Sequence, residues 1–235
     1  YLTTNQFVKY VWDEEYDEDG NVYDGVIFRN IKDAAKDIDN DGGDVFVIKR
    51  PVQAKSATRN KGTFSDYNPD TYSQSAFNLD EEPRFTDKDG RQIKINFPEE
   101  QMLAVRNKYR RTKQWLKAPN GKKSNLNERS WLLVRTPNFK KWFGNWENNP
   151  ESASKVLDEN GEPLIVTHIT QQGGFSVFNT NGDFSVDYDG KTKGTGAWFA
   201  DFKQHDEEIS SLSTEGQNIY HVFLNIRNPY IYNAE

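Results

Sequence analysis

The sequence has no cysteine among its 235 residues, and histidine is scarce. The lack of thiols excludes disulfide bonds, cysteine-ligated zinc and cysteine nucleophiles. The three histidines, His168, His205 and His221, form no HExxH or similar zinc-binding pattern. P-loop, GxGxxG and GxSxG patterns are also missing, so Ser/His/Asp hydrolysis has no local support.

Long hydrophobic runs are missing as well. No stretch approaches the roughly 20 apolar residues that cross a bilayer, and no charged start with an apolar run marks a signal peptide. We therefore expect no membrane partner. The chain begins with Tyr1 and stops at Glu235, directly after a strand-like run, so we expect it to be cut at both ends.

Aromatic residues compensate for a small aliphatic content. Hydrophobic residues make up 34% of the chain, against the usual share of roughly 45–50%. Aromatic residues reach 14%, with 15 Phe, 11 Tyr and 6 Trp. Because aromatic rings bury large areas, this composition predicts one modest core surrounded by long polar segments.

The net charge of -6 conceals two segregated segments. Residues 13–24 hold seven acids and no base, whereas residues 101–126 hold eight bases and no acid. One interpretation of the basic segment is a surface that follows phosphates, with Tyr109 and Trp115 stacking on bases. The alternative, which we favour, is a solvated helix face that docks on the acidic body of the protein.

Hydrophobic spacing and turn residues predict a mixture of strands and helices. A stripe of aromatic residues at helical spacing after Thr136-Pro137 indicates a helix whose apolar face is core, ended by Gly144. The polar residues 58–83 read as a surface linker. Strands do not alternate one to one with helices, so the fold class is α+β. The other expected elements are helices over 4–12, 98–117 and 203–211, strands over 23–31, 44–49, 195–201, 218–226 and 230–232, and hairpins over 84–97 and 155–170.

Two segments carry candidate chemistry. His168 ends a strand-like run, Thr170 follows on the same strand face, and Gly173-Gly174 would let a ligand approach the backbone. The alternative for this histidine is a hydrogen-bonded structural role. Residues 194–201 (GTGAWFAD) are either a plain turn into a core strand or a wall on which a flat ring stacks.

An acidic turn imitates half of a calcium loop. Asp37, Asp39 and Asp41 precede Gly42 with EF-hand spacing, but the twelfth position is Ile48, where a bidentate glutamate is needed. We therefore favour a simple acidic turn and expect no metal site.

Four segments in order resemble one known family. Residues 134–147 (VRTPNFKKWFGNWE), 153–170 (ASKVLDENGEPLIVTHIT), 196–201 (GAWFAD) and 219–229 (IYHVFLNIRNP) are similar to the ADP-ribosyltransferase-like domains of bacterial and phage polyvalent proteins. The GAWFAD segment also resembles the corresponding strand of poly-ADP-ribose polymerases. Residues 108–122 resemble the lead-in that these domains carry.

The N-terminal part resembles the far end of the same family. Residues 23–31, 44–58 and 60–70 look like its last two strands and tail. The resemblance thus implies a C-terminal half over 1–72, a polar and basic linker with a hairpin and a helix over 73–126, and an N-terminal half over 127–235. The chain is either a piece of a tandem array or a circular permutant. We favour pairing of the halves within one chain, because each alone leaves sheet edges open.

The resemblance implies split antiparallel β-sheets with short flanking helices, and NAD bound in a cleft between them. His168 would hold the ribose and amide side of NAD, with Thr170 bracing it. Three residues map onto the second motif strand: Gly196, Trp198 and Phe199. The family's stacking tyrosine falls on Ile209 and its catalytic glutamate on Val45. Asp44 is the adjacent carboxylate, which strand alternation points to the other face unless a bulge intervenes.

Two functions follow from this resemblance. The first is transfer of ADP-ribose from NAD to a protein or nucleic-acid acceptor, although the family's tyrosine and glutamate are replaced. The alternative is a catalytically inactive structural or cargo module, or an NAD-binding module, of a phage or mobile-element polyvalent protein. Its partners would then be other virion or polyvalent-protein modules, and its location the phage virion or the bacterial cytoplasm.

Overall fold

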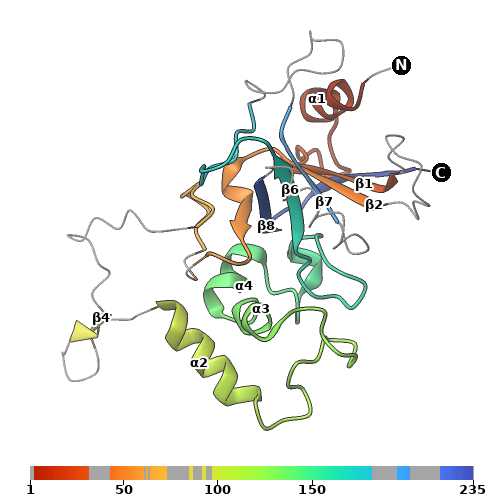
Figure 1. Cartoon of the computed structure of the whole chain (residues 1–235). Coiled ribbons are helices and arrows are strands. Elements are labelled where there is room, and N and C mark those ends of the chain that lie inside the picture. The colour runs from red at the N-terminus through yellow and green to blue at the C-terminus, as the bar shows by residue number, and fades with distance from the viewer. Residues whose placement is uncertain are drawn as a thin grey trace.

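The computed structural model describes residues 3–31, 43–60, 62, 64–72, 85–86, 92–93, 97–181, 195–201 and 218–234. One sheet forms the centre, with helices on its faces (Figure 1). The helices are α1 (Thr4–Glu14), α2 (Phe97–Tyr109), α3 (Glu128–Leu133) and α4 (Pro137–Phe143), with short 3-10 turns at Pro51–Gln53 and Pro150–Ser152. The strands are β1 (Gly25–Ile31), β2 (Gly43–Ile48), β3 (Ala54–Ser56), β4 (Phe85–Thr86), β5 (Gln92–Ile93), β6 (Val166–Thr170), β7 (Ala197–Ala200), β8 (Asn218–Leu224) and β9 (Pro229–Asn233).

Seven strands form the main sheet in the order β3-β8-β6-β7-β2-β1-β9, and β4 pairs with β5 separately. Strands from residues 1–72 and from 127–235 are neighbours at three places: β3 with β8, β2 with β7, and β1 with β9. Both parts of the chain therefore contribute to one sheet. The boundaries at 72 and 126 stay a prediction.

The main sheet contains both parallel and antiparallel pairs, and its central pairing, between β6 and β7, is short. The expectation of wholly antiparallel sheets is wrong at one edge, because β9 runs parallel to β1. Between β6 and β7 the ladder has a single aligned pair, Thr167 with Ala200. Few backbone hydrogen bonds thus join β3-β8-β6 to β7-β2-β1-β9. A mixed sheet with a few helices is an α+β arrangement.

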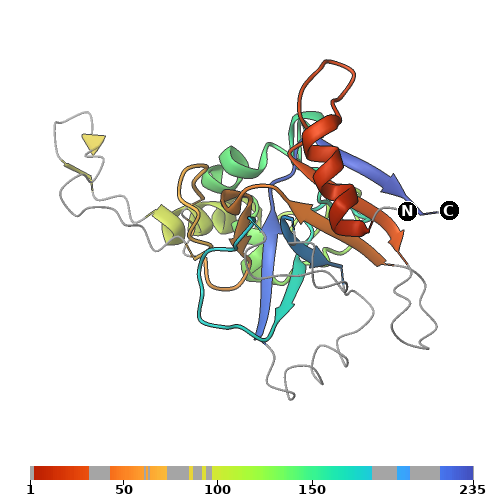
Figure 2. The same ribbon diagram turned by 90° about the horizontal axis from the view of Figure 1, so that it is seen from above.

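Different helices cover the two parts of the sheet. Val8 and Val11 of α1 pack against Val26, Phe28 and Val47, and Figure 2 shows α1 lying across β1 and β2. Helices α3 and α4 cover the β8 end, where the expected aromatic stripe is buried as predicted. Its members are Phe139, Trp142, Phe143 and Trp146, and they form one cluster with Phe223 of β8.

Local capping explains where α1 and α4 begin and end. Thr3 and Gln6 form a capping box at the start of α1, with each side chain bonded to the other residue's backbone N–H. Thr136 caps α4 through Phe139 N–H (3.3 Å), and Pro137 opens the helix. Gly144 ends it with φ 101°, and a Cβ there would lie 2.4 Å from Ala153 Cα, so only glycine fits.

Several expected elements differ in extent. Helix α2 ends at Tyr109, not at residue 117, because Thr112 N–H and its hydroxyl both turn back to the Tyr109 carbonyl. Helix α3 was not expected from the sequence. Only an isolated bridge, Leu157 with Pro163, forms where the first strand of the 155–170 hairpin was predicted. The expected helix over 203–211 and the Asp37 to Asp41 turn lie outside the described residues.

Residues 57–60 and 64–72 are part of the folded body, so the prediction of a surface linker over 58–83 is wrong for these residues. Lys55 of β3 is fully buried, and its ammonium donates to the carbonyls of Asn68 and Asp70 (3.1 Å for Asp70). Ser56 N–H donates to the Thr71 carbonyl (2.9 Å). The segment folds back because its carbonyls satisfy a buried cation, and this burial lowers the pKa of Lys55 to about 8.

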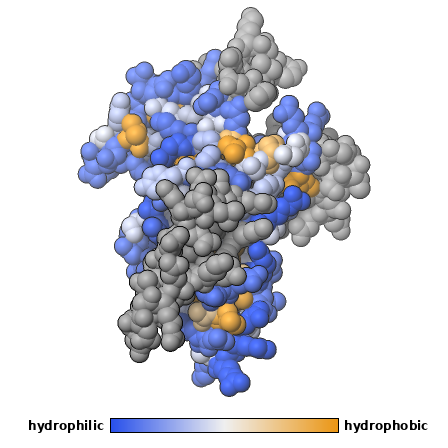
Figure 3. Space-filling model, turned by 90° about the vertical axis from the view of Figure 1, so that its left-hand side faces the viewer, coloured by the Kyte–Doolittle hydropathy of each residue, from blue (hydrophilic) through white to orange (hydrophobic). Residues whose placement is uncertain are grey.

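The described residues on the face seen in Figure 3 are mostly hydrophilic, with small separate hydrophobic areas. Among the helices that the structure describes, none combines the length and the hydropathy needed to cross a bilayer. The buried hydrophobic side chains of the described residues form four clusters, not the one modest core that the composition predicts, and aliphatic residues outnumber aromatic ones among them.

Candidate functional site

His168 lies on β6 at the junction between the two parts of the sheet. Its Nδ1 is 2.7 Å from the backbone oxygen of Trp198 on β7. Because a carbonyl oxygen only accepts, Nδ1 carries the proton in the neutral ring, and Nε2 is left as an acceptor. Nε2 has no hydrogen-bond partner among the described residues. One nitrogen fixes the ring while the other is available.

Four aromatic rings surround this imidazole. The centroids of Phe178 and Phe199 lie 5.1 and 5.5 Å from it, and those of Phe175 and Tyr220 lie 6.4 Å from it. We call these four residues the aromatic box. Burial lowers the pKa of His168 below its ordinary 6.5, outweighing the opposing Trp198 hydrogen bond, so the ring is neutral at neutral pH.

Strand register explains which predicted residues join His168. His168 is aligned with Tyr220 on β8, so the two side chains share a face of the sheet. Phe199 is on this face too. Trp198, one position earlier, packs on the opposite face, where its ring stacks on Phe28 (5.9 Å, 14°) beneath α1. Trp198 therefore reaches His168 through its backbone carbonyl, and its ring lies elsewhere.

Gly196 is required by the protein's own packing. It has φ +80°, and a Cβ there would lie 2.6 Å from side-chain atoms of Trp12 and Val47 and 2.8 Å from the Ile48 carbonyl oxygen. Its N–H donates to the Thr180 carbonyl (3.0 Å). These contacts bring the segment after His168 against the start of β7.

Thr170 lies two residues after His168, on the same face of β6. Its hydroxyl accepts from Gln172 N–H (3.2 Å) and so starts the turn that leads to Phe175 and Phe178. Another backbone bond, from Thr71 N–H to the Ser176 carbonyl (2.6 Å), ties this turn to the segment around Lys55. Ile209, the position of the family tyrosine, lies outside the described residues.

Asp44 is held by a nearby cation. Its carboxylate forms an ion pair with Arg29 and accepts from Asn30 N–H (3.3 Å), where the β1–β2 register shifts between Phe28 and Ile31. Alternation puts Asp44 on the face of Phe46, which is aligned with Phe199. Asp44 thus shares the face of His168, two strands and two residues away, a separation on the order of 10 Å. Val45 points to the other face and packs near α1.

Sequence reasoning missed three members of the aromatic box: Phe175, Phe178 and Tyr220. The run GGFSVF after the His168 strand places two phenylalanines three positions apart, which was an available signal. The position of Tyr220 follows only from the β6–β8 register, which the sequence does not specify.

A second buried polar centre lies around Arg135, which is 6% exposed. Its guanidinium lies 3.8 Å from the Trp131 ring centroid and 5.0 Å from that of Trp146. Ion pairs join it to Glu162 (2.8 Å) and Glu147 (3.1 Å). It also donates to the carbonyls of Trp131 (3.1 Å) and Lys117 (3.0 Å). Each of the three guanidinium nitrogens has a partner, so we interpret this centre as structural.

In the part that the structure describes, no group of three His, Cys, Asp or Glu residues could hold a metal ion.

A comparison with known protein families gives a match to part of the chain. Residues 158–235 match the family model described as ADP-Ribosyltransferase in polyvalent proteins. Comparisons with curated proteins and with solved structures give no match. Residues 158–235, which include His168, Thr170 and Phe199, are therefore similar to the ADP-ribosyltransferase domains of polyvalent proteins.

Proposed function

We propose that the chain binds NAD beside His168 and transfers its ADP-ribose group to a protein or nucleic-acid acceptor. The bond between the ribose C1 and the nicotinamide nitrogen breaks, and nicotinamide leaves with the electron pair. The acceptor nucleophile then bonds to C1 and loses its proton. The observation that carries this proposal is the Nε2 of His168, which has no hydrogen-bond partner among the described residues and lies within the matched segment.

The residues around His168 suit NAD chemically. A neutral imidazole with Nδ1 protonated offers Nε2 as acceptor to a ribose hydroxyl. Rings of the aromatic box, such as the stacked Phe175 and Tyr220 (4.4 Å, 18°), are suited to flat ligands. Since these two rings already stack on each other, we expect a nicotinamide ring to lie beside them. Thr170 fits the bracing role through its position two residues along β6.

A second candidate function, NAD binding without transfer, is favoured by the carboxylates. The position of the family's glutamate is Val45, which packs near α1, and the adjacent Asp44 is ion-paired with Arg29. Losing electrostatic stabilisation of an oxocarbenium-like transition state costs about 3–4 kcal/mol of barrier. Binding would survive this loss while turnover would fall.

Two measurements separate these functions. Calorimetric titration with NAD up to millimolar concentration measures binding, and release of labelled nicotinamide with labelling of the acceptor measures transfer. His168→Ala should abolish both signals. His221→Ala is the matched control, because His221 lies on the neighbouring strand and contacts Thr167 (3.2 Å). Binding without transfer in the wild type supports the second function, and no binding at millimolar NAD overturns both.

We also propose that residues 1–72 and 127–235 are complementary halves of one domain in reversed order. Three junctions between their strands in one sheet support this proposal. Co-expression of residues 1–126 with residues 127–235 should then give a folded complex. Independent folding of either piece would contradict it.

A further inference from the structure

The basic segment 101–126 faces solvent. Arg106 is the exception, since it is half-buried and pairs with Glu128, the one ion pair that this segment makes among the described residues. Among the described bases of the segment, only Arg106 pairs with an acidic group, while the polar Ser124 and Asn125 contact Glu162, Asp158 and Glu159. The other bases are all exposed: Lys108, Arg110, Arg111, Lys113, Lys117, Lys122 and Lys123.

The backbone that carries these cations is held in place. Ala118 N–H donates to the Lys122 carbonyl (3.0 Å), and Gly121 N–H donates to the Ala118 carbonyl (2.9 Å), which closes a tight turn. The Lys117 carbonyl also accepts from Trp131 (3.0 Å) and from Arg135 (3.0 Å). Binding a partner would then not require this backbone to order first, a cost that flexible basic segments carry.

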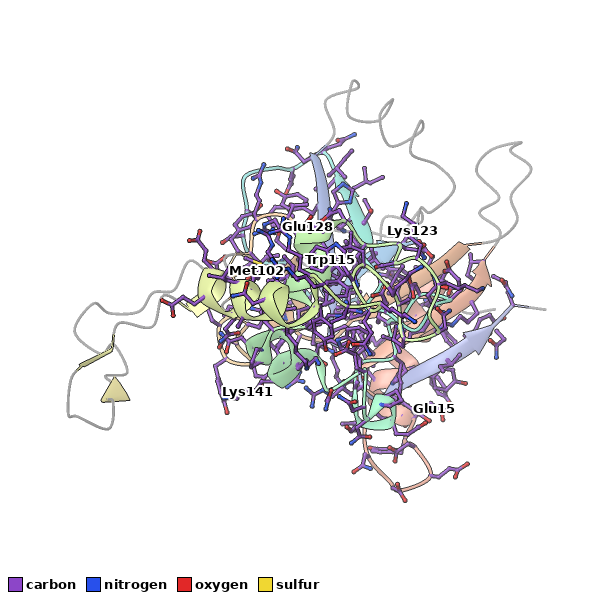
Figure 4. The ribbon with its side chains drawn as sticks, turned by 90° about the horizontal axis from the view of Figure 1, so that it is seen from below. Glu15, Met102, Trp115, Lys123, Glu128 and Lys141 are labelled. Carbon is purple, nitrogen blue, oxygen red and sulfur yellow. The ribbon has the colours of Figure 1, made fainter. Side chains whose placement is uncertain are left out.

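The aromatic residues of this segment point inward. Tyr109 and Trp115 each make an edge contact with Trp131, at 5.4 Å between centroids. Figure 4 shows Trp115 and Lys123 from below, with the Lys123 side chain pointing away from the ribbon. Leu116, between Trp115 and Lys117, has φ 52°, a rare conformation for a branched residue, and it packs in the same cluster. Both rings are thus half-buried and held against Trp131, and Tyr109 also carries the Lys108 ammonium 4.8 Å from its centroid.

We propose that residues 108–123 form a surface that binds the phosphate backbone of double-stranded nucleic acid without reading its sequence. Seven exposed cations on an ordered backbone match a dense, regular array of phosphates. Tyr109 and Trp115 are half-buried and packed against Trp131, so neither offers a fully exposed ring that would favour single strands. Acidic residues border the surface at Asp158 and Glu159, which Asn125 contacts at 3.0 and 2.7 Å, and limit its extent.

The test is fluorescence anisotropy with a labelled DNA duplex of about 20 base pairs at about 50–200 mM salt. The surface variant is Lys113→Glu/Lys122→Glu/Lys123→Glu. The control, Lys9→Glu/Arg50→Glu/Lys141→Glu, removes as many exposed bases elsewhere and has the same net charge. We expect the surface variant to raise Kd at least tenfold and to flatten the slope of log K against log salt by about 2–3. The control should change Kd by less than about threefold.

Binding to other ligands distinguishes double-stranded nucleic acid from single strands and from membranes. Duplex RNA of the same length should bind within a few-fold of duplex DNA, and single-stranded DNA more weakly. Equal loss of binding in both triple variants would reduce the effect to net charge and overturn the proposal. So would binding to phosphatidylserine vesicles without binding to duplexes. Circular dichroism of both variants verifies that each is folded.

Discussion

Two aromatic-lined polar centres in this protein differ in how many of their nitrogen atoms have hydrogen-bond partners. Around Arg135, two carboxylates and two backbone carbonyls occupy all three nitrogens between Trp131 and Trp146. Around His168, four rings enclose an imidazole with one nitrogen bonded and the other without a partner among the described residues. A saturated centre holds the fold together, whereas a centre with an available acceptor is suited to a ligand.

The two centres also manage charge differently. Arg135 faces Glu147 and Glu162, and Glu162 additionally accepts from the Ser124 hydroxyl. Among the described residues that contact His168 there is no carboxylate, and burial lowers its pKa instead. Arg135 is therefore a buried cation that is paired with carboxylates, whereas His168 is a buried ring that is neutral because it has lost its proton.

The largest expected effect is at the saturated centre. Arg135→Met leaves Glu162 buried without its cation, so the free energy of unfolding should fall by about 3–5 kcal/mol. Urea unfolding followed by fluorescence measures this change. The double variant Arg135→Met/Glu162→Met should recover part of the loss, because the uncompensated charge is gone. A single-variant loss below about 1 kcal/mol would show that the centre is not structural.

Lys55 is a third case, a buried cation whose hydrogen-bond acceptors are carbonyls. Its pKa falls from 10.5 to about 8, so the unfolded chain binds its proton more tightly. Wild-type stability should therefore rise between pH 8 and pH 10.5, relative to Lys55→Met, by on the order of 3 kcal/mol. Urea unfolding of both proteins across this range measures the difference. A difference in unfolding free energy that does not change with pH would mean that the carbonyls stabilise the ammonium as well as water does.

The open centre should contribute less to stability and more to binding. His168→Asn removes an imidazole whose protein hydrogen bond is worth about 1 kcal/mol, so the unfolding free energy should change by about this amount. NAD affinity should fall about tenfold or more, since the acceptor nitrogen is lost. Calorimetry and thermal melts measure the two effects. A stability loss as large as that of Arg135→Met would make His168 structural.

The smallest expected effect is on pH dependence. Because the neutral ring offers Nε2 as acceptor, NAD affinity should stay constant from pH 8 down to the ordinary pKa of 6.5. It should fall only below that value, by at most about tenfold per pH unit. His221→Ala should leave this profile unchanged. An affinity that rises on acidification would mean that the protonated ring binds.

Local features of the fold could be predicted from the sequence. The cap at Thr136, the stop at Gly144 and the aromatic stripe of α4 depend on near neighbours, and all were predicted. The parallel pairing of β9 was not, because it depends on strands about two hundred residues apart. The same holds for the fold-back around Lys55, where distant carbonyls determine the structure.

The site shows a similar division. The pattern of His168 and Thr170 on one strand predicted a candidate site, and the Phe199 ring lies 5.5 Å from that of His168. Trp198 could not share that wall, because adjacent residues of a strand point to opposite faces. Strand alternation could have been applied to the sequence, but the family resemblance led to the prediction that Trp198 and Phe199 lie in the same site. The tautomer of His168 and the ion pair of Asp44 with Arg29 depend on tertiary contacts, so they could not be predicted from the sequence.

The interleaved sheet also has a consequence for synthesis. Strand β1 ends at Ile31, yet its parallel partner β9 begins at Pro229. At about 5–20 residues per second, the ribosome needs on the order of ten seconds or more between the two. During that delay the early strands have unpaired edges in the cell, where they can aggregate or attract chaperones. The order of the strands thus makes the nascent chain most vulnerable until its last strand emerges.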